Sequence, residues 1–246
     1  MNQHTVKAYG DELNQLTAEV ARMGGLAEAQ VADAVDSVAR RDVALGRAVV
    51  ERDGRLDAMH REIEKKAIRP IALRGPVASD LRKTLASMKL ATDLERTGDL
   101  AKNIAKRGLI LAEGEPIPPL TRSIERMGKL VSLRLRHVLD AYAASEIERA
   151  VAVWNTDDEV DEHYNSLFRE LLTYMMGDPR TITAGTHLLF MAKNLERIGD
   201  HATNIAETIH YEITGQDMTG ERPRWTPSDE AALIAPDTTP ATAADR

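Results

Sequence analysis

Acidic and amide side chains recur in two copies of one short pattern, at a spacing that could bind a metal cation. Residues 91–105 read ATDLERTGDLAKNIA and residues 192–206 read AKNLERIGDHATNIA, with ten of fifteen aligned positions identical. Residues three or four apart lie on one face of a helix, so each copy aligns a Glu, an Asp and an Asn in a column of oxygen ligands. The columns are Glu95, Asp99 and Asn103, and Glu196, Asp200 and Asn204.

A second set of carboxylates precedes each copy. It consists of Asp53 and Asp57 before the first copy and of Asp157 and Asp161 before the second. The helical stripe that contains the later pair is otherwise apolar or aromatic, so we expect these side chains to face inward or toward a neighbouring helix. Each half of the chain therefore gathers two Asp from one helix against Glu-x-x-x-Asp from the next.

Four carboxylates in one place need a counter-charge, because burying an unpaired charge costs several kcal/mol. No cation in the sequence is placed to neutralise both clusters in the same way. A bound metal ion would do so, and hard oxygen ligands suit iron, manganese, magnesium or calcium better than a structural zinc. The alternative is an exposed acidic groove with loosely held counterions.

The shared pattern also places a glycine, Gly98 or Gly199, inside each predicted helix. A glycine in a helix interior costs about 1 kcal/mol relative to alanine. We therefore expect another element to approach the helix backbone closely at both positions. Two helices would rarely share Glu-Arg-x-Gly-Asp-x-x-x-Asn by chance, so the chain is interpreted as an internal duplication.

The composition limits the class of protein. The absence of cysteine excludes disulfides, thiolate metal ligands and a cysteine nucleophile. A net charge of −7 argues against general nucleic-acid binding. The first residues lack an apolar signal region and no run approaches the length of a membrane span, so we expect a cytoplasmic protein. Few large aromatic residues leave an aliphatic core, which suits helices better than sheets.

The periodicity of the apolar residues predicts an all-α fold, built as two tandem antiparallel three-helix bundles. We expect six helices, over 4–40, 42–69, 79–112, 121–143, 145–176 and 181–214. Asp42 is the expected N-cap of the second helix, which Pro70 and the Gly75-Pro76 pair are expected to end, and Ser145 and Glu148 form a capping box. The domains are then residues 1–114 and 115–215, followed by a tail over 216–246 that we expect to be disordered.

With these features the chain resembles the PhoU family of phosphate-transport accessory regulators. The resemblance rests on the doubled motif, on the run PVASDLR at 76–82 and on the six-helix duplication, and it spans about residues 4–215. It implies iron-type multinuclear clusters or other divalent metals, zinc included. The ligands that it implies are Glu95, Asp99, Glu196 and Asp200.

The resemblance also implies a function. It predicts negative control of phosphate uptake and of the phosphate-starvation response, through contacts with the ATPase subunit of the phosphate ABC transporter and with a sensor histidine kinase. We expect a homodimer that reaches the membrane only through these proteins. One departure is that His201 of the second copy corresponds to Leu100 in the first.

A second class of function is a carboxylate-bridged di-iron oxidase or a metal-storage bundle. Such enzymes place Glu-x-x-His ligands on two of their helices. Glu207 and His210 have that spacing, but the first half contains no counterpart. The sequence therefore favours a non-enzymatic regulatory adaptor.

Overall fold

The computed structural model describes residues 2–74, 78–115, 118–156 and 158–219, and these residues contain helices and no strand. The fold class predicted from periodicity, all-α, is confirmed. The helices in chain order are α1 (Asn2–Arg40), α2 (Val43–Arg74), α3 (Ala78–Glu113), α4 (Pro118–Ala144), α5 (Ile147–Asn155), α6 (Asp158–Gly177), the short 3-10 helix η1 (Pro179–Thr181) and α7 (Ile182–Thr214).

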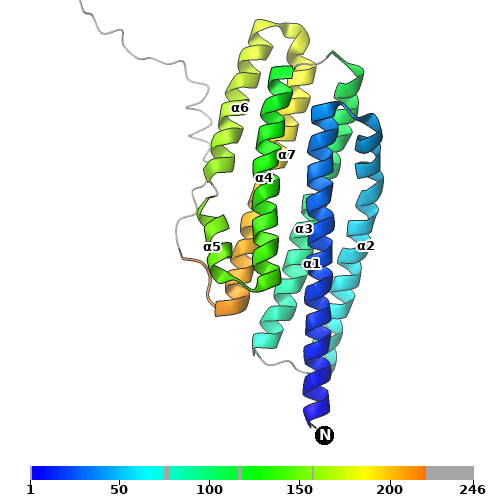
Figure 1. Cartoon of the computed structure of the whole chain (residues 1–246), viewed down its shortest axis with the longest axis vertical. Coiled ribbons are helices and arrows are strands. Elements are labelled where there is room, and N and C mark those ends of the chain that lie inside the picture. The colour runs from blue at the N-terminus through cyan, green and yellow to red at the C-terminus, as the bar shows by residue number, and fades with distance from the viewer. Residues whose placement is uncertain (1, 75–77, 116–117, 157, 220–246) are drawn as a thin grey trace, which may run out of the picture.

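The helices form two bundles that share one core. Helices α1, α2 and α3 pack together, as do α4, α5, α6 and α7, and the halves join through α1 against α4 and α3 against α7. In Figure 1, α1 and α4 lie in front of α3 and α7, with α2 on one flank and α5 and α6 on the other. The apolar residues of both halves belong to one continuous buried cluster, so the halves stabilise each other through hydrophobic burial.

The two halves meet in an antiparallel arrangement. Across α3 and α7, Asp93 pairs with His201 at 2.8 Å (Oδ1 to Nδ1), while the guanidinium of Arg107 stacks over Phe190 at 4.2 Å. Helices α3 and α7 therefore run in opposite directions, because a later residue of α3 contacts an earlier residue of α7. The middle of each duplicated motif therefore lies beside the middle of the other, at the centre of the molecule.

Helix boundaries were predicted less well than helices. Asp42 does cap α2, because its Oδ1 accepts from the backbone N–H of Leu45 at 2.9 Å. Pro70 does not end α2 as predicted, because a proline removes only one backbone donor and the helix continues to Arg74. The Gly75-Pro76 pair, the other predicted end signal, lies outside the described residues. The predicted capping box is also wrong, because Ser145 lies outside the helix with a φ of 54°.

The helix predicted over 145–176 is divided into α5, which ends at Asn155, and α6, which begins at Asp158, so the described part of the second half contains one more α-helix than predicted, besides the short η1. The expected ligand Asp157 lies outside the described residues, as do 220–246 of the tail that we expect to be disordered. The domain boundaries at 114 and 215 stay a prediction.

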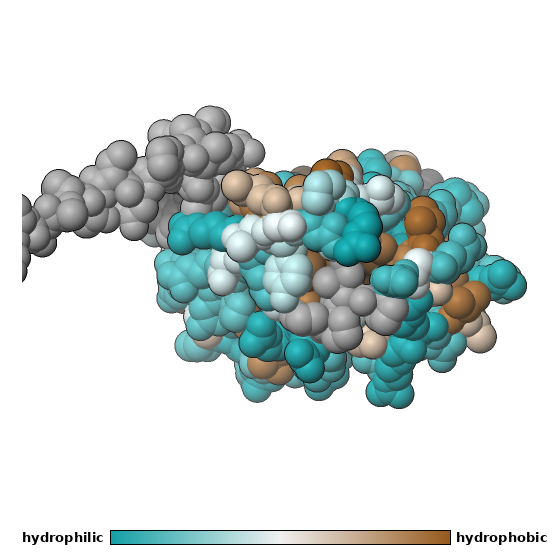
Figure 2. Space-filling view, turned by 90° about the horizontal axis from the view of Figure 1, so that it is seen from above, coloured by the Kyte–Doolittle hydropathy of each residue, from teal (hydrophilic) through white to brown (hydrophobic). Residues whose placement is uncertain are grey.

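One end of the bundle has a predominantly hydrophilic surface. Figure 2 shows this end, which carries the α1–α2 turn, where teal side chains surround smaller brown areas. Within the described ranges, no helix is both long and apolar enough to cross a membrane.

Candidate metal centre

Both motif glycines are sites of close helix approach, as the sequence predicts. A Cβ added at Gly98 would lie 2.3 Å from Leu56 Cδ1 on α2, and one added at Gly199 would lie 3.2 Å from Val160 Cγ1 on α6. These two contacts bring α2 against α3 in the first half and α6 against α7 in the second. Asp53 Oδ1 accordingly lies 3.6 Å from the Cβ position of Gly98.

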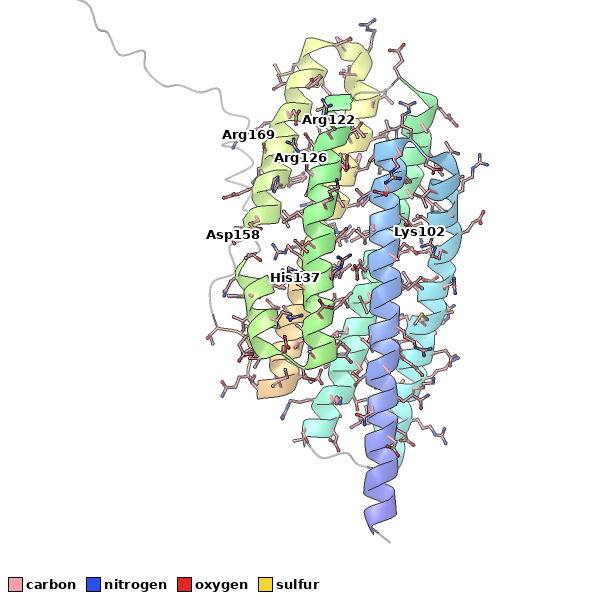
Figure 3. The ribbon with its side chains drawn as sticks, viewed as in Figure 1. Lys102, Arg122, Arg126, His137, Asp158 and Arg169 are labelled. Carbon is pink, nitrogen blue, oxygen red and sulfur yellow. The ribbon has the colours of Figure 1, made fainter. Side chains whose placement is uncertain are left out.

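In the first half, Lys102 holds two of the predicted ligands. Its Nζ lies 2.5 Å from Asp53 Oδ2 on α2 and 2.5 Å from Asp99 Oδ1 on its own helix. Figure 3 labels Lys102 among the helices of the first half. Asp53 is 6% exposed, and its other oxygen accepts from Gln30 Nε2 on α1 at 3.2 Å. Burial lowers the pKa of Lys102, but the hydrogen bonds to both carboxylates outweigh it and raise the pKa above its ordinary value.

The remaining first-half candidates are less enclosed. Glu95 and Asp57 are half-buried, whereas Asn103 is exposed. Arg96 lies 3.6 Å from Glu95 (Nε to Oε2) and 4.0 Å from Asp99 (Nη1 to Oδ2), with 60% of its side chain exposed. An exposed pair of this kind contributes little to stability. The candidate ligands of the first half therefore range from the buried Asp53 on α2 to the exposed Asn103 on α3.

The second half replaces both polar partners of that arrangement. Thr203 occupies the motif position of Lys102. Arg134 of α4 corresponds to Gln30 of α1, because each stands directly before a buried residue of the core, Leu135 or Val31. The buried guanidinium of Arg134 donates to the carbonyls of Val153, at 2.9 Å, and of Thr156, at the C-terminal end of α5. It also lies 3.4 Å from Thr203 Oγ1. A cation at a helix C-terminus stabilises the last carbonyls.

Glu196 is the most unusual carboxylate of the second half. Its Oε1 pairs with Lys193 Nζ at 2.8 Å, and its Oε2 is buried without a hydrogen-bond partner among the described residues. Burial raises the pKa of Glu196, and the nearby charge of Asp200 raises it further, while Lys193 opposes both. Asp161, Asp200 and Asn204 are half-buried.

The two halves consequently differ in how well they fit a metal ion. Within the described ranges, no three or more Asp, Glu or His side chains are arranged so that they could hold a metal ion. In the first half, the ammonium of Lys102 stands between the two carboxylates that would be ligands. In the second half, a buried carboxylate oxygen of Glu196 has no hydrogen-bond partner among the described residues, and such an oxygen is costly to leave unpaired.

The polar groups that sequence reasoning missed are Gln30, Lys102 and Arg134. Lys102 follows Asp99 by three residues, a spacing typical of helical ion pairs, and this signal was available. Its contact with Asp53 spans 49 residues. The roles of Gln30 and Arg134 likewise depend on contacts between helices, which periodicity does not indicate.

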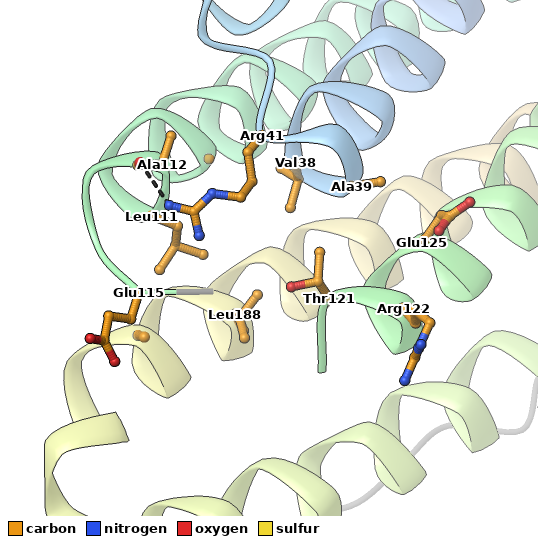
Figure 4. Close-up of a pocket in the computed structure, with 12 residues that line it drawn as sticks. Val38, Ala39, Arg41, Leu111, Ala112, Glu115, Thr121, Arg122, Glu125 and Leu188 are labelled. Carbon is orange, nitrogen blue, oxygen red and sulfur yellow. Dashed lines mark hydrogen bonds between the residues drawn. The ribbon is translucent and has the colours of Figure 1, made fainter. Parts of the chain in front are cut away.

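A cavity of about 270 Å³ lies apart from the candidate metal ligands, at the end of the bundle where the two halves meet. Figure 4 shows its lining, which includes Arg41, Glu115, Arg122 and Leu188. The guanidinium of Arg41 donates to the carbonyl of Ala112 at 2.8 Å and so fastens the α1–α2 turn to the end of α3. This contact gives Arg41 a structural role.

Comparisons with known proteins agree with this architecture. The model of the PhoU domain matches the chain twice, over residues 20–108 and 124–209. A protein of Caulobacter vibrioides named "Phosphate-specific transport system accessory protein PhoU homolog" is 65% identical over 224 residues, which cover 91% of this chain and 97% of that protein. A homolog of the same name from Rhizobium meliloti is 52% identical, covering 90% and 93%.

Solved structures give the same result. The crystal structure of PhoU from Pseudomonas aeruginosa has a TM-score of 0.82 at 38% identity and covers 85% of this chain and all of that chain. The phosphate transport system regulatory protein PhoU from Streptococcus pneumoniae has a TM-score of 0.79 at 29% identity, covering 86% and 99%. Two matches of the family model, near-complete relatives and the duplicated helical fold together show that this chain belongs to the PhoU family.

Proposed function

We propose that this protein is a regulatory accessory protein of phosphate-specific transport, which lowers phosphate uptake and phosphate-starvation signalling when phosphate is plentiful. The observation that carries the proposal is the near-complete match, at 65% identity, to a protein named as a phosphate-specific transport system accessory protein. The fold supports it, because long helices offer extended faces on which other proteins can dock.

The proposed partners are the ATPase subunit of the phosphate ABC transporter and the sensor histidine kinase of the phosphate two-component system. Both act at the inner face of the membrane, so a cytoplasmic protein would reach them by protein contact. We further propose that the protein acts as a homodimer. Because the proposed contacts are with these membrane-associated proteins, a fraction of the protein should sediment with membranes only in cells that contain the transporter or the kinase.

The proposal extends to a bound metal in the second half. Glu196 and Asp200 would hold it, with Asp157, Asp161 and Asn204 as further oxygen ligands, and iron, manganese, magnesium or zinc are the candidate ions. The support is the buried Oε2 of Glu196 together with the mutual repulsion of Glu196 and Asp200. A bound cation would offset the repulsion between these two carboxylates.

The regulatory proposal is tested with a clean deletion in phosphate-rich medium, in which any second copy of the gene is deleted as well. We expect phosphate uptake and a starvation-gene reporter to stay high, and restoration of the wild-type gene to lower both. An unchanged reporter and unchanged uptake would remove the assignment. Copurification from cells with and without phosphate, with metals and bound proteins identified together, then tests the partners.

The oxidase or storage alternative is tested on the purified protein. After loading with ferrous iron, consumption of oxygen or peroxide with repeated turnover would favour a carboxylate-bridged enzyme. The adaptor proposal predicts at most a single stoichiometric oxidation of bound iron.

Membrane binding that persists in cells lacking both the transporter and the kinase would point to a contact with lipid rather than with these proteins.

A further inference from the structure

We propose that the first half of this protein contains its own cation: the ammonium of Lys102 occupies the place between Asp53 and Asp99 that a metal ion would take. The first half is then complete without metal, and metal dependence belongs to the second half alone. The comparison between the halves rests on the proposed metal site, whereas the arrangement around Lys102 does not.

The contact geometry carries the first step. Nζ of Lys102 lies 2.5 Å from Asp53 Oδ2 and 2.5 Å from Asp99 Oδ1, so one ammonium bridges carboxylates from α2 and α3. Oxygen ligands bind Ca²⁺ at about 2.3–2.6 Å and Mg²⁺ at about 2.0–2.1 Å. A metal ion that used these two oxygens would therefore need the position of the ammonium, and the two cations exclude each other.

Burial carries the second step. The side chain of Asp53 is 8% exposed and that of Lys102 is 22% exposed. Asp53 also accepts from Gln30 Nε2 through its other oxygen, so both of its oxygens have protein partners. Displacing Lys102 would leave an ammonium to be resolvated and would break a network that already satisfies Asp53. An incoming metal has little to gain there, because it would replace one neutralising charge by another.

The second half carries the third step, because the duplicated motif does not repeat the lysine. Thr203 stands at the position of Lys102, and a hydroxyl supplies no charge. Arg134, the buried cation of this half, donates to backbone carbonyls at the end of α5. Glu196 keeps one buried oxygen without a partner among the described residues. The same motif therefore has an internal cation beside its Asp in one half and a threonine at that position in the other.

The decisive experiment compares Lys102→Met with Lys106→Met in the full-length protein, using Mn²⁺ alone as the probe. Lys106 is an exposed lysine one turn further along α3, so it controls for the loss of one positive charge. After chelation, we expect Lys102→Met to unfold at a lower temperature than Lys106→Met. On titration with Mn²⁺, calorimetry should find one additional binding site in Lys102→Met, and adding Asp99→Asn should abolish it.

An equal response to Mn²⁺ in the two lysine variants would overturn the inference. So would a Lys102→Met protein that fails to fold even when refolded with millimolar Mn²⁺. A second variant tests the intact network: Asp99→Asn alone should leave the wild-type Mn²⁺ stoichiometry unchanged, whereas Asp200→Asn should lower it. Equal losses in these two variants would also overturn the inference.

The same titrations separate this inference from the proposed function. If the wild-type protein binds no Mn²⁺ while Lys102→Met gains a site, the second-half metal proposal fails and the role of Lys102 stands. If the wild-type protein binds Mn²⁺ through Asp200 and Lys102→Met gains nothing, the metal proposal stands and Lys102 is an ordinary ion pair.

Discussion

Replacing the two motif glycines by alanine should have unequal effects, although the glycines occupy the same place in the duplicated motif. In a helix interior, alanine is more favourable than glycine by about 1 kcal/mol, so each substitution first gains that amount of stability. The new methyl group then meets a different neighbour in each half. At Gly98 it would lie 2.3 Å from Leu56 Cδ1, and at Gly199 it would lie 3.2 Å from Val160 Cγ1.

The magnitude follows from these distances. Leu56 is fully buried, and forcing an added methyl group into a packed core costs about 1–3 kcal/mol. After the helix gain of about 1 kcal/mol is subtracted from this cost, Gly98→Ala should lower the free energy of unfolding by up to about 2 kcal/mol. At Gly199 a shift of a few tenths of an ångström by Val160 relieves the contact, so the two effects nearly cancel.

The assay is denaturant unfolding of the full-length protein in chelator, read from the transition midpoint at constant slope. Gly25→Ala is the matched control, because Gly25 is exposed in α1 and a Cβ there meets nothing within 4 Å; it should gain about 1 kcal/mol. In a Leu56→Val background, which imitates Val160, Gly98→Ala should cost less. A Gly98→Ala protein as stable as Gly25→Ala would refute the packing argument.

Three further changes test individual interactions. Replacing Arg134 by methionine should cost about 2–4 kcal/mol in denaturant unfolding, because carbonyls at the end of α5 lose a buried donor; faster amide exchange in α5 than elsewhere should accompany it. Trp154→Phe should cost about 1 kcal/mol in the same assay, since the indole N–H no longer donates to Glu207 Oε1, 3.0 Å away. Burial raises the pKa of Glu212 from 4.5 to about 6 against the opposing charge of Lys83, so the folded chain holds this proton more tightly and the stability from that group is lost as the pH rises through about 6. Glu212→Gln should therefore gain more melting temperature over wild type at pH 7.5 than at pH 5, and an equal gain at both values would contradict this assignment.

The sequence was sufficient for those features that depend on local and repeated signals. Apolar residues recur along every helix, so the loss of one signal leaves the helix prediction intact. The motif glycines predicted close helix approach because a glycine in both copies needs a reason that helix formation does not supply. Boundaries rest on single residues, and two of these misled: Pro70 lies inside α2, and Ser145 has a φ of 54° and does not cap α5.

The charge balance of the site could not be predicted because its partners come from different helices. The sequence indicated that no cation neutralises both halves in the same way, and among the described residues Lys102 of the first half corresponds to Thr203 in the second. It did not indicate that the halves use different cations. Lys102 acts across α2 and α3, whereas Arg134 reaches from α4 to the end of α5. Such pairings appear only when the helices are packed.

The two halves differ by an exchange of polar partners at corresponding positions. Gln30 and Lys102 surround the aspartate in the first half, and Arg134 and Thr203 stand at those places in the second. Of these paired positions, the charged one lies on the motif helix in the first half and on the first helix of the bundle in the second. Changing one of these positions alone would remove a charge or place two together, whereas changing both keeps the charge constant. The duplicated motif alone therefore does not determine the charge around its aspartate in either half.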